Sequence, residues 1–203
     1  MQTAAGGQRP PSFEDMWDRP LFAQFDRHIA ARHHVPESYL SAIRERRGEK
    51  STFFVRPDVG VTGDLEWFAA RDFLREIGFV ENLLCSAAFR QAFGHCGGTV
   101  AQEPEQLECA TSWRRLSFQT LADSLTDVVG AIGVPMAKKS ADHLGWYTSG
   151  MLCAGRSRRQ HIFETRDRWS DWFGGGFHNR TWVGFDPPLG HVWVVCVADH
   201  RLQ

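Results

Sequence analysis

Three residue types that together perform nucleophilic acyl transfer occur in this sequence in a suitable order. Cys85 lies early in an expected helix, where the helix dipole favours a thiolate. His178 and Asp186 follow in a region of expected strands, where the imidazole could activate the thiol and the carboxylate could orient the imidazole. The competing interpretation is that Cys85 is a small buried apolar residue and that Asp186 begins a turn. The residue types favour this second interpretation.

A resemblance supports the enzymatic alternative. The stretch Trp182-Val183-Gly184-Phe185-Asp186-Pro187 resembles the tryptophan-to-aspartate segment of transglutaminase-like cysteine enzymes, which also carry Cys, His and Asp in this order. The resemblance implies a cysteine-dependent acyl-transfer or hydrolytic enzyme with Cys85, His178 and Asp186 as its catalytic residues. In this chain His178 is followed directly by Asn179 and Arg180, whereas the histidine of the family opens an aromatic-rich strand of its own.

Soft metal ligands are also present, namely Cys85, His95, Cys96 and Cys109. Zinc takes such ligands tetrahedrally, but the spacing of these four matches none of its standard patterns. Gly174 to Gly176 does not form a phosphate-binding pattern. We therefore predict no metal and no other cofactor.

A run of arginines and aromatic residues is the main candidate for binding a partner. Guanidinium groups bind oxyanions in a fork and stack on rings, so this composition suits phosphate, single-stranded nucleic acid or an acidic protein surface. The residues predicted to bind a partner are Arg156, Arg158, Arg159, Arg166, Arg168, Trp169 and Trp172. The alternative is a solvated loop whose charges are balanced by Glu164, Asp167 and Asp171.

The elements that position these residues are predicted to be helices first and a sheet afterwards. Apolar periodicity predicts two short helices within 20–47, a helix from Asp64 to Ile77, another from Asn82 to Phe93, and two more over 120–132 and 136–152. Gly97 to Glu108 is predicted to be a loop. A short strand at 51–55 and strands at 160–164, 181–186 and 191–198 complete the prediction. The last strand is predicted to be central, with helices covering one face and Trp and Phe residues covering the other.

Length and composition indicate one α+β domain, with N-terminal helices packed on a C-terminal antiparallel sheet. We assign residues 13–203 to this domain and residues 1–12, rich in Gly, Gln and Pro, to a flexible leader. The net charge of -1 disfavours nucleic acid as a partner. No apolar run approaches the length of a membrane span, and the odd set of five cysteines without a signal segment indicates a cytoplasmic protein.

Since no catalytic pattern outweighs its structural alternative, a binding protein is the favoured class. The segments Trp169 to Phe173, Thr181 to Val183 and Val194 to Asp199 together resemble the C-terminal sheet of small bacterial immunity-type proteins. This resemblance implies a cytoplasmic, stoichiometric inhibitor that covers the active site of a toxin or enzyme. Under this interpretation the chain is not an enzyme, and its partner is a protein.

Overall fold

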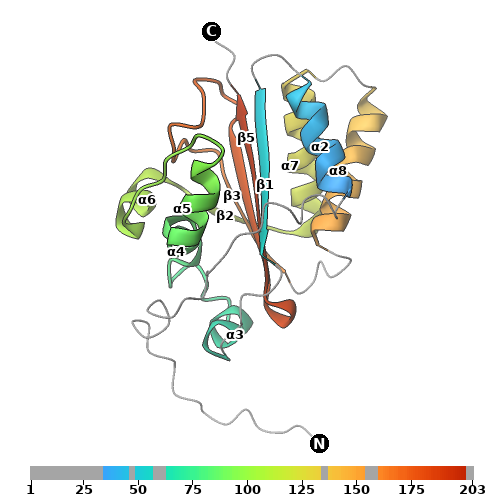
Figure 1. Cartoon of the computed structure of the whole chain (residues 1–203). Helices are drawn as coiled ribbons and strands as arrows, with labels where there is room; N and C mark the ends of the chain where they lie inside the picture. The colour runs from blue at the N-terminus through green and yellow to red at the C-terminus, as the bar shows by residue number, and fades with distance from the viewer. Residues whose placement is uncertain (1–33, 46–48, 57–62, 134–136, 154–159, 200–203) are drawn as a thin grey trace, which may run out of the picture.

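An antiparallel sheet of five strands, in the order β1-β5-β4-β3-β2, forms the centre of the computed structural model (Figure 1). The structure describes residues 34–45, 49–56, 63–133, 137–153 and 160–199. The strands are β1 (Glu49–Arg56), β2 (Arg114–Leu116), β3 (His161–Thr165), β4 (Arg180–Asp186) and β5 (His191–Asp199). The helices are α2 (His34–Arg44), α3 (Gly63–Ala70), α4 (Phe79–Cys85), α5 (Ala87–Gly94), α6 (Pro104–Ala110), α7 (Phe118–Ala131) and α8 (Lys138–Leu152), with the 3-10 turn η2 (Pro187–Leu189).

Helices cover both faces of the sheet. Figure 1 shows α2, α7 and α8 on one face and α4, α5 and α6 on the other. This arrangement confirms the predicted α+β class. The predicted leader at 1–12 and the first short helix within 20–47 lie outside the described residues. Within the described part of the chain, no helix is both long and apolar enough to cross a membrane.

Strand β5 shows why the sheet carries a core on each side. It pairs with β1 and β4, and its side chains alternate between two apolar clusters. Val194 and Cys196 pack with α3 to α6, whereas Trp193 and Val195 pack with α2, α7 and α8. The prediction of a central strand covered on both faces is confirmed.

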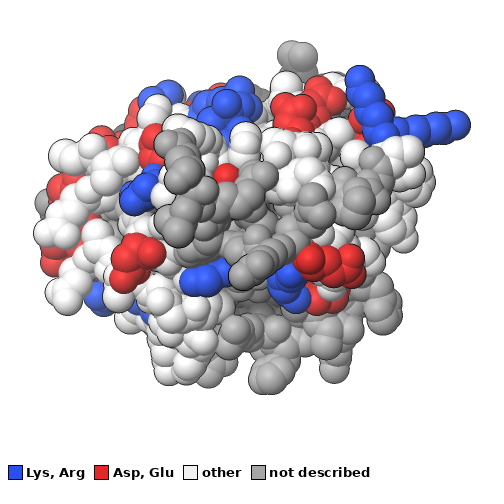
Figure 2. All heavy atoms as spheres, turned by 90° about the horizontal axis from the view of Figure 1, so that it is seen from above, with Lys and Arg blue, Asp and Glu red and all other residues white. Residues whose placement is uncertain are grey.

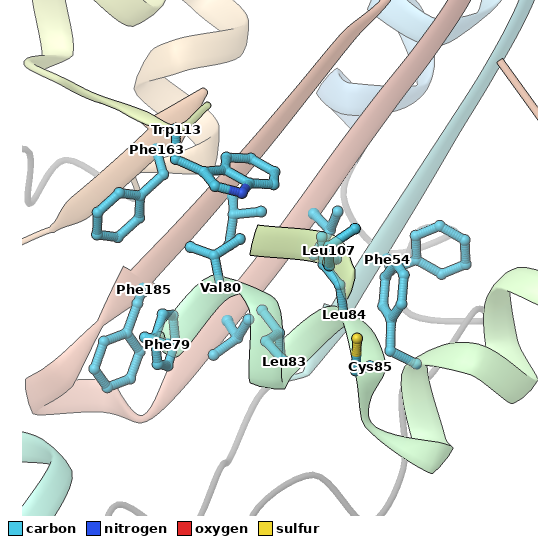
Figure 3. Packing of buried hydrophobic residues seen from close by; sticks show 14 of the residues in the cluster. Phe54, Phe79, Val80, Leu83, Leu84, Cys85, Leu107, Trp113, Phe163 and Phe185 are labelled. Carbon is cyan, nitrogen blue, oxygen red and sulfur yellow. The ribbon is translucent and has the colours of Figure 1, made fainter. Parts of the chain in front are cut away.

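The cluster under α4 to α6 is rich in aromatic rings (Figure 3). Phe79 lies 5.1 Å from Phe185 between ring centroids, and Phe54 lies 5.1 Å from Phe89. Each fully buried aromatic side chain removes about 150 to 250 Å² from water. Much of the high aromatic content of the chain is therefore used in packing.

Two predicted helices are shorter than expected. The helix that begins near Asp64 ends at Ala70, because Asp72 adopts a φ of 64° that an α-helix cannot contain. Phe73, which lies within the predicted helix, falls outside the observed one and is 44% exposed. The predicted helix at 82–93 is broken at Ser86, whose backbone is extended and whose Oγ accepts a hydrogen bond from the N–H of Phe89.

The predicted loop from Gly97 to Glu108 was wrong in part, since α6 begins there at Pro104. Proline at the first helical position needs no hydrogen-bond donor, and the buried Leu107 anchors the short helix on α4. Strand β2 was not predicted. Its three residues form a strand only by pairing with β3.

Candidate functional site

The structure does not bring together the three residues of the predicted catalytic triad. His178 precedes β4, and Asp186 is the last residue of β4, so the strand separates them by roughly 20 Å at about 3.3 Å per residue. Cys85 lies in the apolar cluster beside Phe54 (Figure 3), and burial raises the pKa of its thiol to about 11. These positions contradict the arrangement that a cysteine nucleophile requires.

The potential metal ligands noted in the sequence differ in their exposure to solvent. Cys85 is buried, Cys96 is half-buried and Cys109 is exposed. No group of three or more potential metal ligands occurs among the residues that the structure describes.

Part of the predicted arginine and aromatic run forms a well-ordered connection between β3 and β4. We call residues 166–173 the arginine loop. Arg166 and Arg168 are exposed, as the prediction requires. Trp169 and Trp172 are only 5% and 4% exposed, so they belong to the core and not to a binding surface. Arg156, Arg158 and Arg159 lie outside the described residues.

The two buried tryptophans anchor the arginine loop to the helices on this face. The ring centroids of Trp169 and Trp172 lie 5.0 and 5.5 Å from that of Phe93 in α5. The indole N–H of Trp169 donates a hydrogen bond of 2.8 Å to Oγ1 of Thr181 in β4. Packing and hydrogen bonding together hold the backbone that carries Arg166 and Arg168.

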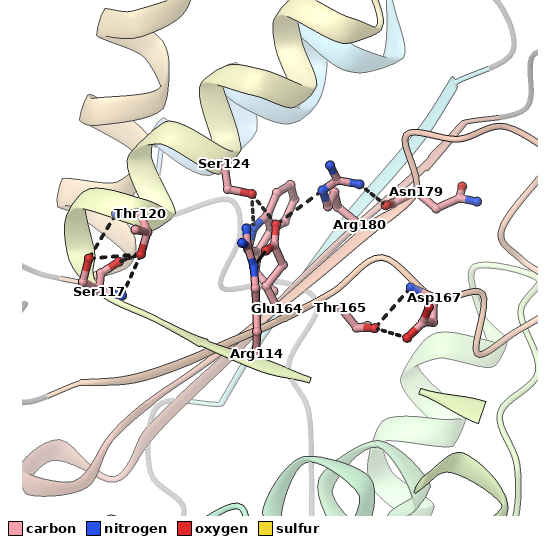
Figure 4. Close-up of polar contacts among 10 residues, drawn as sticks. Arg114, Ser117, Thr120, Ser124, Glu164, Thr165, Asp167, Asn179 and Arg180 are labelled. Atoms are coloured by element: carbon pink, nitrogen blue, oxygen red, sulfur yellow. Dashed lines mark hydrogen bonds and ion pairs between the residues drawn. The ribbon is translucent and has the colours of Figure 1, made fainter. Parts of the chain in front are cut away.

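The aspartates of the arginine loop are engaged in local hydrogen bonds. Oδ2 of Asp167 accepts from the backbone N–H of Ser112 at 2.6 Å and from Oγ1 of Thr165 at 3.1 Å (Figure 4). Oδ1 of Asp171 accepts from the backbone N–H and Oγ1 of Thr99 at 3.0 and 2.8 Å. These hydrogen bonds from Thr99 hold the pKa of Asp171 below its usual value.

The third nearby carboxylate, Glu164, is completely buried between two arginines (Figure 4). It accepts a hydrogen bond from Nε of Arg114 at 2.5 Å and lies 3.3 Å from Nε of Arg180. The hydroxyl of Ser124 in α7 also donates to it, and Ser124 in turn accepts from the indole N–H of Trp182 at 3.1 Å. Glu164 therefore connects β2, β3, β4 and α7, because its carboxylate oxygens accept from or pair with side chains of the other three elements.

Arginine groups outnumber carboxylates around Glu164. Burial lowers the pKa of the Arg180 guanidinium, and the nearby charge of Arg166 lowers it further, whereas Glu164 has the opposite effect. Among the described residues, neither Arg166 nor Arg168 forms an ion pair. The alternative of a solvated loop whose charges are balanced by Glu164, Asp167 and Asp171 stays a prediction, since both arginines are exposed and charge balance requires no direct ion pair.

The surrounding surface has no continuous field of one sign. Figure 2 looks down on the end of the molecule at which β4 begins and β5 ends, and basic and acidic side chains are interspersed over it. This mixture agrees with the net charge of -1. Electrostatic interactions at this end are therefore local, and they act within about one Debye length, roughly 8 to 10 Å.

No family model, curated protein or solved structure matches this chain. The fold is of the α+β class, and the function has to be argued from the residues themselves.

Sequence reasoning did not find the buried hydrogen-bond and ion-pair network around Glu164. Glu164 is the one acidic residue of β3, and Arg180 is the one basic residue of β4, which also contains Asp186; this is a weak signal of a buried ion pair. Arg114 and Ser124 carry no such signal, because they come from elements 40 to 50 residues earlier in the chain. Only pairing of β2 with β3 and packing of α7 bring them to Glu164.

Proposed function

We propose that this chain is a protein-binding module that acts as a stoichiometric inhibitor of immunity type and covers a partner toxin or enzyme. The single observation that supports the proposal is the arginine loop, which presents Arg166 and Arg168 exposed and without a described ion-pair partner. Because packing already fixes the backbone of the arginine loop, binding a carboxylate restricts only the rotamers of the two arginine side chains and not the loop itself. Arginine is also one of the residue types enriched at protein interfaces.

The chemistry of the loop indicates the kind of partner. Two guanidinium groups at i and i+2 suit a surface with clustered carboxylates, which each guanidinium can contact through two hydrogen bonds. Trp169 and Trp172 contribute indirectly, by holding the loop, and do not contact the partner. The cysteine enzyme alternative receives no support from the geometry, since β4 separates His178 from Asp186 and Cys85 is buried in an apolar cluster.

A charge-reversal experiment tests this proposal. The tagged chain is expressed in its source cells, the dominant bound protein is identified, and its affinity is measured by surface plasmon resonance at two salt concentrations. The variant Arg166→Glu/Arg168→Glu is expected to weaken binding by ~2 kcal/mol, or about 30-fold, chiefly through slower association. The purified partner should lose its enzymatic or toxic activity at a one-to-one ratio with the wild-type chain.

The matched control is Lys138→Glu/Lys139→Glu, which makes the same change in net charge. Both lysines are exposed at the start of α8, on the opposite face of the sheet from the helices that hold the arginine loop. This variant should bind almost normally. Equal losses in the two variants would refute the assignment of the loop, and a partner whose activity survives saturation would refute the inhibitor role.

A further inference from the structure

A second polar site lies at the other end of the sheet, where β3 begins. A cavity of about 390 Å³ opens there between α3, β2, β3 and η2. Its walls combine charged and polar groups with small apolar ones. The polar residues are Glu66, Asp72, Arg115, Gln160 and His161, and the apolar ones are Ala69, Ala70, Pro187 and Pro188. Cavities of about 300 Å³ and above are large enough for small metabolites.

Asp72 has a conformation that directs its carboxylate to the sheet. Among the described residues it is the only one other than glycine with a positive φ, which costs an aspartate roughly 1 kcal/mol or more. Its Oδ1 forms an ion pair with Arg115 of β2 and lies 3.7 Å from Nδ1 of His161. The same conformation ends α3, because the backbone N–H groups of Asp72 and Phe73 donate to the carbonyl oxygens of Ala69 and Phe68.

The contacts of His161 determine which of its ring nitrogens carries a proton. Nη2 of Arg115 lies 3.4 Å from Nδ1, and because a guanidinium only donates, this contact favours the tautomer in which Nδ1 accepts. Burial and the charge of Arg115 lower the pKa of His161 to about 4, so the ring is neutral near pH 7. The single proton is therefore on Nε2, and the ring offers one N–H donor on its far side.

These groups define a site with both signs of charge. Arg115 is 46% exposed in its side chain and has five N–H donors, of which Asp72 and His161 occupy only some. Asp72 is 62% exposed in its side chain, and Glu66 is also exposed. A simple anion would meet two carboxylates here. A simple cation would be repelled by the guanidinium of Arg115 and would offer no acceptor to the N–H of the buried His161.

We propose that this cavity binds a free α-amino acid with a short apolar side chain. The ligand carboxylate accepts hydrogen bonds from Arg115 and from the Nε2–H of His161. The ligand ammonium group lies against Asp72 and Glu66. The ligand side chain packs on Ala69, Ala70 and the two prolines of η2. This site is independent of the arginine loop, which lies at the opposite end of β3.

Isothermal titration of the full chain with L-alanine, L-valine, L-leucine and L-methionine at millimolar concentration tests the proposal. At least one of the four is expected to bind with one-to-one stoichiometry. For L-leucine, the two truncated analogues are 4-methylpentanoate, which lacks the amine, and 3-methylbutylamine, which lacks the carboxylate. Each analogue should bind at least about 100-fold more weakly than the amino acid, because each leaves one set of polar groups without a partner.

Two variants locate the site on the protein. Arg115→Met should weaken binding about 10- to 100-fold through loss of a charge-assisted hydrogen bond, while Arg71→Met should have no effect. Arg71 is the matched control because it lies next to Asp72 but stacks on Trp67, 4.0 Å from the ring centroid. Asp72→Asn provides a second test if Arg115→Met unfolds, since asparagine tolerates the same backbone conformation. This variant should also weaken binding.

Three results would overturn the proposal. The first is that none of the four amino acids binds. The second is that an analogue binds as tightly as the amino acid. The third is that Asp72→Asn, or a folded Arg115→Met, binds like the Arg71→Met control.

Discussion

Replacing Glu164 by methionine is expected to destabilise the protein strongly. The side chain of Glu164 is fully buried, and its carboxylate is the only described acid that pairs with Arg180. Arg180 is itself only 7% exposed, so its charge would remain in the interior without compensation. Removing one partner of a buried ion pair costs about 3 to 5 kcal/mol. This is a large part of the ~5 to 15 kcal/mol that separates the folded and unfolded states of a domain.

The second partner of Glu164 should matter much less. Arg114 accounts for the shorter contact, but its side chain is 57% exposed. After loss of the ion pair its guanidinium can return to water. Arg114→Met is therefore expected to cost at most about 1 kcal/mol. The ranking of the two arginines follows from their burial and not from the length of their contacts.

Urea denaturation monitored by tryptophan fluorescence measures both effects. Trp182 is a suitable reporter because its indole donates to Ser124 within the same network. The double variant Glu164→Met/Arg180→Met removes both charges, and it should cost at least ~2 kcal/mol less than the sum of the two single variants. The reasoning is refuted if Glu164→Met costs less than about 1 kcal/mol, or if the two single effects simply add.

Three further predictions concern other parts of the fold. Gly184→Ala should destabilise the protein by about 1 to 3 kcal/mol in the same urea assay, because a Cβ there would overlap a tryptophan ring of β5. Gly130→Ala in α7 is the control: a Cβ there meets open space, so this variant should be neutral or stabilising by up to ~1 kcal/mol. Iodoacetamide at pH 8 should label the exposed Cys109 well before the buried Cys85, whose pKa is raised to about 11, as peptide mass spectrometry can show. The pKa of His161 is about 4 in the folded state and near 6.5 in the unfolded state. As the pH falls, the unfolded chain therefore binds the extra proton first, and the free energy of unfolding should decrease by up to about 3 kcal/mol between pH 6.5 and pH 4. His161→Gln should flatten this part of the pH profile of the urea midpoint, and an unchanged slope would contradict the assignment.

The sequence by itself determined the helices and strands in which apolar residues recur with a regular spacing. The apolar stripe of Leu121, Leu125 and Val128 predicted α7, since residues at i, i+4 and i+7 share one helix face. The continuous apolar run of β5 predicted a strand covered on both sides. Gly190 adopts a φ of 61° at the end of the turn after β4, where its lack of a Cβ permits this conformation. In each case neighbouring residues carry the information.

The tertiary structure alone decided which polar residues meet. Arg114 reaches Glu164, and Asp72 reaches Arg115 and His161, only after β2 has paired with β3 and the turn that follows α3 has packed over them. Strand β2 has no propensity signal of its own, and the break in the helix at Ala70 depends on the conformation of Asp72. Contacts between residues 40 to 90 positions apart leave no periodic pattern in a single sequence.

The difference between sequence and tertiary information also explains where the aromatic side chains lie. The composition shows that Trp and Phe are abundant. The pattern of residues from Arg166 to Trp172 is compatible with a binding interface and with a core. Burial of Trp169 and Trp172 against Phe93 separated the two roles, leaving only the arginines of this segment at the surface. Transfer of an aromatic ring out of water is favourable in any apolar environment, so the residue type predicts that the ring is buried. Only the folded chain shows whether the ring is buried in its own core or is left for a partner to cover.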